Sequence, residues 1–354
     1  MIRKTFAAVS AMLVLFSLLV VSVPADDKKR RVKRPVKAKM AKANPMVSML
    51  PASDVIVTVN GKRFFADALP NVLSANQKLL SEILSKLDAI QIRTGVDLRK
   101  FENIVAGVNV AKKEGGKFDI DPVAIAGGTG DSASLIAAAK KSTEGKFREE
   151  QIGSRTMYVF SSKDITSKDI TDNLKGQKAA GAANKAGVDL AVAAFDASTI
   201  VFGHAGRVRE TIEAKSTVSP ELIDLLGRKP VGVVNFAGKV PGGMSAFLPL
   251  GNDELGANID SIKYLYGRMD VLATQATVSL TARTLQPQQA ADLKGTLEGL
   301  RDLGKGLLGG SKGADKQLYA RLLGNVKVTQ VANEIYLDLA IPQTDLDALV
   351  AILK

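Results

Sequence analysis

The chain of 354 residues contains no cysteine and no tryptophan. The lack of cysteine excludes a thiol nucleophile, an iron–sulfur cluster, a zinc site with sulfur ligands and a lipid attached through an N-terminal cysteine. An exported chain can fold without disulfides when its core is large, and this chain is long enough for such a core. We therefore do not expect redox chemistry performed by the protein's own side chains.

Aromatic residues are also scarce, at 5% of the sequence. The hydrophobic content of 46% is nevertheless sufficient for one large core or two modest ones, which argues against a disordered chain. The core must consist of Val, Ile, Leu and Ala, with Phe as the main bulky residue. Sites that stack a sugar or enclose a cation between aromatic rings are accordingly disfavoured.

The first 25 residues are typical of an export signal. Arg3 and Lys4 form a basic start, and the apolar stretch from Thr5 to Val23 ends in Val23-Pro24-Ala25, which fits the subsites of a signal peptidase. We predict cleavage after Ala25 and a periplasmic or secreted mature protein. The alternative is that residues 5–23 remain as a membrane anchor, and the positive charge that follows them would hinder export.

Most of the positive charge lies directly after this signal. Residues 26–42 contain nine Lys or Arg against two Asp, and Arg3 and Lys4 add two charges, so residues 43–354 carry only +3 of the chain's +12. The nine cationic residues, called the basic segment below, are Lys28, Lys29, Arg30, Arg31, Lys33, Arg34, Lys37, Lys39 and Lys42. Because residues 26–48 have few large apolar side chains, we expect them to be a disordered tail.

The basic segment has two interpretations. It could bind an envelope polyanion or an anionic membrane surface, where each basic residue contributes roughly 1 kcal/mol, or it could be a solvated linker. A pI of about 9.6 reflects this tail and not the folded body, so nucleic acid is not an expected partner.

The first half of the body, residues 49–228, alternates strands and helices. Residues 55–59 alternate as a strand, and Ser74 with Gln77 resembles a capping box for a helix that ends at Gly95 and packs on a sheet. The further elements expected in this half are a hairpin of 104–111 and 120–127, a helix from Asp131 or Ser132 to Lys141, hairpins of 146–152 with 155–161 and of 189–195 with 199–204, and a helix over 205–214.

Residues 162–187 differ in composition from the rest of this half. The run Ser162-Lys163-Asp164-Ile165-Thr166 is repeated at once, and Gly, Ala, Lys and Asn dominate thereafter. Such a composition offers little to bury, so we predict a mobile surface insertion.

The second half, residues 229–354, follows a similar plan. It is expected to contain a strand over 231–236, a hairpin of 263–273 and 276–283, helices over 287–308 and 314–323, a hairpin of 326–331 and 334–341, and a last helix over 344–353. Each half opens with a Val-rich strand and closes with a hairpin followed by a helix. The predicted fold class is α+β, with two related halves, each a mostly antiparallel sheet with helices packed on one face.

Two short motifs and the repeated hairpin–helix arrangement carry a resemblance to a known group of proteins. The opening Leu50-Pro51-Ala52-Ser53-Asp54, the helix end Thr94-Gly95-Val96-Asp97 and the hairpin–helix units resemble exported bacterial proteins of uncharacterised function. The resemblance implies export and a duplicated α+β body, and it transfers no active-site residues.

His204 is the only histidine and therefore the only candidate imidazole base. A catalytic triad would need a nucleophile and a carboxylate beside it, and a metal site would need further ligands at a suitable spacing. The run from Val201 to Arg207 contains neither a nucleophile elbow nor a ligand spacing of this kind. We expect a structural role for His204.

The run Gly127-Gly128-Thr129-Gly130-Asp131-Ser132 lies between an expected strand and an expected helix, where free backbone amides can bind phosphate. It lacks the Gly-Lys-Ser/Thr ending of a P-loop and the spacing of a dinucleotide motif, and Asp131 would repel phosphate. A flexible turn before a capped helix is the favoured interpretation.

Two further patterns are weaker. Asp253, Glu254 and Asp260 form the best carboxylate group for a hard cation such as calcium, but their spacing matches no standard loop, so helix capping is favoured. Gly295 and Gly299 form a small-xxx-small pattern interrupted by charged residues, which favours close helix packing over membrane insertion. No catalytic, metal-binding or cofactor-binding residue is assigned, and no cofactor is expected.

The leading functional hypothesis is an exported, non-catalytic envelope protein that serves as a binding or scaffold module for an unidentified protein or surface. One alternative is a hydrolase that uses Asp253 with Asp260 and needs neither His nor Cys. Another is a periplasmic carrier of an apolar ligand held between sheet and helices.

Overall fold

The computed structural model describes residues 44–112, 118–161, 189–229, 231–242 and 253–352. The export signal, the basic segment and the insertion of 162–187 lie outside these residues. The chain divides into two compact units: the N-terminal unit includes Asn44–Pro70 and Gln77–Ile223, and the C-terminal unit includes Asn71–Asn76 and Asp224–Lys354. The sequence patterns predict this division at residue 229.

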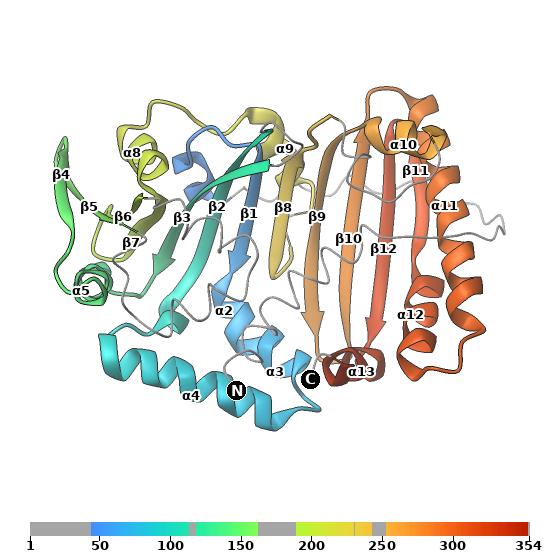
Figure 1. The fold of residues 1–354 in the computed structure, drawn as a ribbon, viewed down its shortest axis with the longest axis horizontal. Coiled ribbons are helices and arrows are strands. Elements are labelled where there is room, and N and C mark those ends of the chain that lie inside the picture. Colours follow the sequence, from blue (N-terminus) through green and yellow to red (C-terminus); the bar gives the residue numbers. More distant parts are fainter. Residues whose placement is uncertain (1–43, 113–117, 162–188, 230, 243–252, 353–354) are drawn as a thin grey trace. The chain divides into compact units, whose positions relative to one another are not determined.

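The N-terminal unit contains seven antiparallel strands in the order β1-β2-β3-β7-β6-β5-β4 (Figure 1). Its strands are β1 (Val55–Asn60), β2 (Phe101–Lys112), β3 (Phe118–Gly128), β4 (Arg148–Ile152), β5 (Arg155–Ser161), β6 (Asp189–Ala194) and β7 (Thr199–His204). Its helical elements are η2 (Pro45–Met49), α2 (Gly61–Arg63), η3 (Phe64–Ala68), α3 (Leu69–Val72), α4 (Gln77–Thr94), η4 (Leu98–Lys100), α5 (Ser132–Ser142), α8 (Ala205–Glu213) and α9 (Pro220–Gly227), of which α3 and α9 continue past the unit boundaries.

The C-terminal unit contains five antiparallel strands in the order β8-β9-β10-β12-β11. The strands are β8 (Val234–Lys239), β9 (Ile262–Leu272), β10 (Gln275–Thr284), β11 (Lys327–Val331) and β12 (Glu334–Pro342). The helices are α10 (Asp253–Asp260), α11 (Pro287–Gly309), α12 (Ala314–Asn325) and α13 (Gln343–Ile352). The α+β class with antiparallel sheets is therefore confirmed.

The two units share one topology. In each, a single strand is followed by helix, hairpin, helix, hairpin and helix, and the order β8-β9-β10-β12-β11 corresponds to β1-β2-β3-β7-β6. The N-terminal unit has one additional hairpin, β4–β5, which continues its sheet beyond β6. The sequence predicts two related halves, and duplication of one ancestral unit would produce this correspondence.

The C-terminal sheet has one apolar and one polar face, because successive side chains of a strand point to opposite sides. Ala282 and Ile335 are buried against Ala290 and Leu293 of α11. Their strand neighbours Thr281, Arg283, Glu334 and Tyr336 point to the other face. Figure 1 shows α11 and α12 lying side by side along this sheet. The helices that form the core thus cover one face, as predicted.

The N-terminal sheet has helices on both faces. Leu135 and Ile136 of α5 pack against Phe160, Val192 and Ile200. The alternate residues of the same strands, among them Ala191, Ala193 and Val201, are buried on the opposite side, and α8 packs there with its own buried residues. Because α5 covers one face and α8 covers the other, this sheet buries apolar side chains on both faces.

The helix α4 departs from the sequence prediction in two ways. It begins at Gln77, so Ser74 lies outside the helix. The Ser74 hydroxyl is 3.3 Å from Asp347 Oδ1 and 2.8 Å from Gln343 Nε2. The predicted capping box is therefore wrong. None of its described side chains is buried. Its apolar stripe is only half-covered and Leu84 is exposed, so it does not pack on the sheet as closely as predicted.

Candidate functional site

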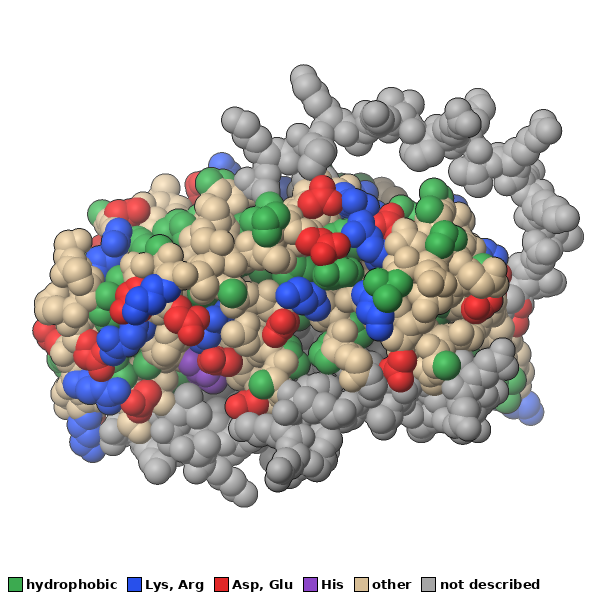
Figure 2. Space-filling model, turned by 90° about the horizontal axis from the view of Figure 1, so that it is seen from above, with side chains coloured by type: hydrophobic (Ala, Val, Ile, Leu, Met, Phe, Trp, Pro, Cys, Tyr) green, Lys and Arg blue, Asp and Glu red, His purple; other side chains and the backbone are tan. Residues whose placement is uncertain are grey.

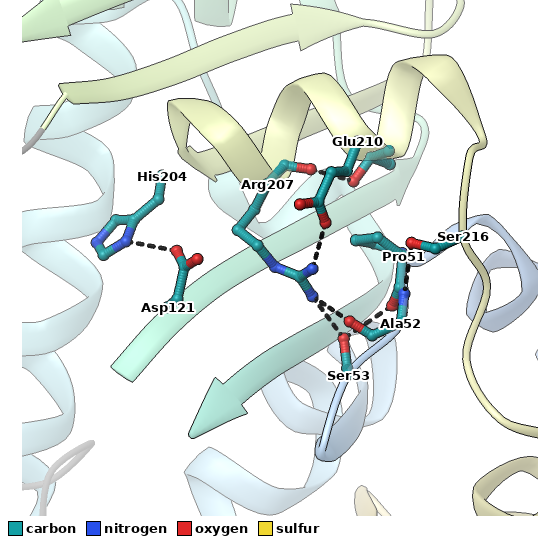
Figure 3. Close-up of polar contacts among 9 residues, drawn as sticks. Pro51, Ala52, Ser53, Asp121, His204, Arg207, Glu210 and Ser216 are labelled. Atoms are coloured by element: carbon teal, nitrogen blue, oxygen red, sulfur yellow. Dashed lines mark hydrogen bonds and ion pairs between the residues drawn. The ribbon is translucent and has the colours of Figure 1, made fainter. Parts of the chain in front are cut away.

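Arg207 is the most deeply buried charged side chain in the described part of the chain, with 2% of the residue exposed. It lies on α8, and its Nη2 donates to the carbonyl of Ala52 at 2.7 Å and to the hydroxyl of Ser53 at 2.8 Å (Figure 3). Its Nη1 donates to the carboxylate of Glu210, one turn further along the helix. We call these four residues the Arg207 cluster.

The Arg207 cluster accounts for the motif at Leu50-Pro51-Ala52-Ser53-Asp54. The Ser53 hydroxyl donates to Pro51 O at 2.8 Å, the Ala52 amide donates to Ser216 Oγ at 3.1 Å, and Asp54 Oδ2 accepts from the amide of Val110 at 3.0 Å. Gly107 allows this approach, because a Cβ on that residue would lie 2.4 Å from Ser53 Oγ. The motif is therefore held in place by side chains far away in sequence and supplies no reactive group.

His204 ends β7 and pairs with a carboxylate that the sequence analysis did not identify. Its Nδ1 lies 2.7 Å from Asp121 Oδ1 on β3. The pairing of β3 with β7, which places Val123 opposite Gly203, brings the two side chains together. Figure 2 shows the histidine at the surface beside acidic side chains. Among the described residues no hydroxyl hydrogen-bonds to the imidazole, so the pair lacks the nucleophile of a triad.

The polar face of the C-terminal sheet holds a second group of charged and phenolic side chains, the Glu334 cluster. Glu334 Oε1 accepts from Arg228 Nη1 at 2.9 Å and from Arg283 Nε at 2.8 Å, and Oε2 accepts from the Tyr336 hydroxyl at 2.7 Å. Thr281 lies between Tyr266 and Tyr336 across three adjacent strands. Lys229 Nζ lies 5.3 Å from the centre of the Tyr336 ring. The carboxylate of Glu334 is thus fully engaged.

The environment of this cluster shifts several pKa values. Burial raises the pKa of the Glu334 carboxyl, but the hydrogen bonds from Tyr336 and Arg283 and the charge of Arg228 outweigh it, so the pKa lies below its ordinary value. Burial and the neighbouring Glu334 raise the pKa of Tyr336. Burial lowers the pKa of Lys229, against the attraction of Asp338. A general acid or base is most effective when its pKa is near the working pH, and Glu334 and Tyr336 are shifted away from neutrality.

The glycine-rich run 127–132 forms the predicted turn before a capped helix. Asp131 is the N-cap of α5, and its carboxylate accepts from the amides of Ala133 and Ser134 at 3.0 and 3.2 Å. Hydrogen bonds from the Ser134 hydroxyl and the Ala133 amide lower the pKa of Asp131. Gly130 lies against the ring of Phe101, where a Cβ would come within 2.6 Å of Cζ. The amides that would bind phosphate are therefore occupied by the protein's own carboxylate.

The acidic residues of the hydrolase and metal hypotheses lie along α10. Asp253 opens this helix and Asp260 closes it, so two helical turns, about 10 Å of axial rise, separate their backbones. Within the described residues no group of three His, Asp or Glu side chains is placed to hold a metal ion. The structure therefore offers no support for a carboxylate pair formed by Asp253 and Asp260.

The glycines of α11 do not mediate close packing, which corrects the sequence prediction. A Cβ added to Gly295 or Gly299 would meet no atom within 4 Å. The contact with the sheet is made instead by Leu293, which is fully buried, while Leu303 and Leu307 are 61% and 69% exposed. No described helix is long and apolar enough to cross a membrane.

Comparisons with known proteins show similarity at the level of structure alone. No family model matches the chain, and no curated protein matches it. Crystal forms I, III and IV of TP0453 match it with TM-scores of 0.41, 0.42 and 0.43 and sequence identities of 11%, 9% and 8%. The matches cover 88%, 86% and 88% of this chain and 99%, 97% and 96% of TP0453.

The Arg207 cluster predicts a large difference between two arginines on α8. Arg207→Met keeps the aliphatic part of the side chain but leaves the Ala52 carbonyl and Ser53 without their donor, which should lower the free energy of unfolding by about 2–3 kcal/mol. Arg209→Met removes a half-exposed ion pair with Glu150 and should cost about 1 kcal/mol or less. Urea unfolding of both variants tests this, and equal losses would contradict the assigned role of Arg207.

The lowered pKa of Glu334 predicts a specific acid sensitivity. Its ionised form stabilises the fold above the ordinary carboxyl pKa of 4.5, and this contribution is lost as the pH falls through the lower folded-state value. Glu334→Gln should therefore be less stable than wild type at pH 7 and show a flatter decline of unfolding free energy between about pH 5 and 3. Asp338→Asn, which replaces a half-exposed carboxylate on the same strand, serves as the comparison and should lose less stability at pH 7 than Glu334→Gln.

Proposed function

We propose that this chain is an exported, non-catalytic protein of the cell envelope that binds an anionic lipid surface through its basic segment and serves there as a binding or scaffold module. The observation that carries the proposal is the distribution of charge. Seven of the twelve net positive charges lie in residues 26–42, directly after a stretch with the features of an export signal.

The basic segment is well suited to an anionic surface. Near such a membrane each Lys or Arg contributes about 1 kcal/mol, and the attraction decays within a Debye length of roughly 8–10 Å. Few large apolar side chains interrupt its nine cations, so charge and not apolar contact dominates its attraction to lipid. Other envelope polyanions could engage the same cations, and they are distinguished from lipid by the experiment below.

The folded body complements this assignment because its own charges are largely paired. On the face seen in Figure 2, basic and acidic side chains are interspersed. The cations of Arg207 and Arg283, and the more exposed Arg228, are paired with Glu210 and Glu334. A nearly neutral body contributes little long-range attraction, so the basic segment dominates the encounter with a negative surface.

The arrangement of polar groups favours binding over catalysis. In both the Arg207 cluster and the Glu334 cluster, the charged groups are paired with opposite charges or backbone carbonyls and connect strands with helices or loops, although Arg207 Nε is buried without a partner. The pair of His204 and Asp121 has no hydroxyl partner among the described residues. These features support a binding or scaffold role for the two units.

The proposal predicts salt-sensitive binding to vesicles. Protein of residues 26–354 should sediment with vesicles containing about one third phosphatidylglycerol at low salt, and replacing the nine cations with Gln should weaken binding at least tenfold, because electrostatic attraction is screened and charge-dependent. Vesicles of phosphatidylcholine alone provide the uncharged control.

Three results would count against this function. Binding that does not change between 50 mM and 500 mM salt would exclude an electrostatic attachment. Equal binding to uncharged vesicles would point to apolar contacts elsewhere. Tight binding to a soluble polyanion such as heparin, with none to lipid, would replace the membrane surface by another envelope polymer.

A further inference from the structure

One side of α11 is exposed over most of the length of the helix. Its exposed residues recur at intervals of three or four positions, so they lie opposite the buried Ala290 and Leu293. We call this side the α11 seam, and it consists of Asp292, Gly295, Gly299, Leu303, Gly306 and Leu307. In Figure 1, α11 lies on the outer side of the C-terminal unit. The seam is therefore accessible to another molecule.

Two leucines of the seam are exposed although their side chains are apolar. Leu303 is 61% exposed and Leu307 is 69% exposed. Among the described helices, no other has two leucines that are more than half exposed. Apolar side chains gain free energy when they leave water, so this pair favours association with an apolar surface.

The glycines of the seam have no packing role inside one chain. Glycine within a helix is destabilising relative to alanine. A Cβ added to Gly295, Gly299 or Gly306 would meet no atom within 4 Å, so the fold of a single chain does not require glycine at these positions. Small residues do allow the backbone of a second helix to approach closely. The glycines thus leave hollows that a leucine of another helix can fill.

The order of leucines and glycines is self-complementary. We consider two antiparallel copies of α11 whose two-fold axis lies at the level of residue 301. Leu303 of each copy is then level with Gly299 of the other, because both are two residues from the axis. Leu307 is level with Gly295 in the same way, since each is six residues from the axis. One arrangement therefore gives both leucines a glycine of the second copy as neighbour.

The charges at the two ends of the seam are complementary in this arrangement. Asp292 at its start and Lys312 beyond its end are both exposed, and neither makes an ion pair within the described residues. The antiparallel pair sets Asp292 level with Gly310 of the second copy, two residues before Lys312. The two cannot pair within one chain, because the helix from Asp292 to Gly309 spans about 25 Å.

We propose that two copies of this chain associate through the α11 seam, with the two helices antiparallel. The glycines contact no helix of their own chain, and the second copy supplies one. The contact involves one helix of each chain, and interfaces below about 1,200 Å² belong to weak or transient complexes. We therefore expect a dimer that dissociates in the micromolar range. The proposal does not depend on the basic segment or on attachment to a membrane.

Sedimentation velocity of the mature chain, residues 26–354, over about 1 to 300 μM measures this dimer. Gly299→Leu should weaken association at least tenfold, because the new side chain fills the hollow for Leu303 of the second copy. It should not lower the melting temperature, since leucine is a better helix former and meets no neighbour in its own chain. The matched control is Gly206→Leu on α8, which also faces open space and should change association less than twofold.

A charge exchange tests the antiparallel register. Asp292→Lys should weaken association at least threefold, because it places like charges beside each other at both ends of the seam. Adding Lys312→Asp to the same chain should restore the affinity to within twofold of wild type. Such a restoration reports a contact between chains, because the two positions are too far apart to pair within one.

Four results would overturn the proposal. The first is a wild-type chain that stays monomeric throughout the concentration range, and the second is Gly299→Leu that associates as wild type does. The third is a charge exchange that fails to restore association. The fourth is a monomeric chain that binds vesicles of phosphatidylcholine and loses this binding on Leu303→Ser, which would identify lipid as the occupant of the seam.

Discussion

The remaining structure depends on one constraint in each unit. This constraint is the pairing of the last strand with the second strand of the first hairpin. In the N-terminal unit β7 pairs with β3, and in the C-terminal unit β12 pairs with β10. Both pairings join segments far apart in sequence, so the loop entropy they cost must be recovered from ladder hydrogen bonds and buried apolar side chains. Once they form, the following helix starts at a fixed point beside the sheet.

The polar clusters described above are consequences of these pairings. The β3–β7 register sets His204 beside Asp121 and starts α8 where Arg207 can reach the carbonyl of Ala52. The β10–β12 register sets Arg283 opposite Glu334 and Thr281 opposite Tyr336. In each unit, burying a charge is tolerated because the strand order delivers its partners at hydrogen-bonding distance. The charges then make the register more specific, since a one-residue slip would leave them unpaired.

Local patterns in the sequence predicted most elements but few of the contacts between them. Alternation and turn residues located the hairpins to within a few residues, and Asp131 was correctly identified as one of two candidate caps. The start of α4 was missed because Ser74 hydrogen-bonds to Gln343 and Asp347, more than 260 residues away. The partners of His204, Arg207 and Glu334 were missed for the same reason.

The additional hairpin β4–β5 changes which strand ends the N-terminal sheet. Without it, β6 would be the edge strand, and its unpaired backbone groups could pair with a strand of another molecule. This strand contains four apolar residues in succession, Leu190, Ala191, Val192 and Ala193. With it the border is β4, whose sequence Arg148-Glu149-Glu150-Gln151 is charged and short. Exposed strands with such side chains resist pairing with a second molecule. The hairpin thus protects the sheet from aggregation. A chain lacking it would be expected to polymerise by pairing of its edge strands.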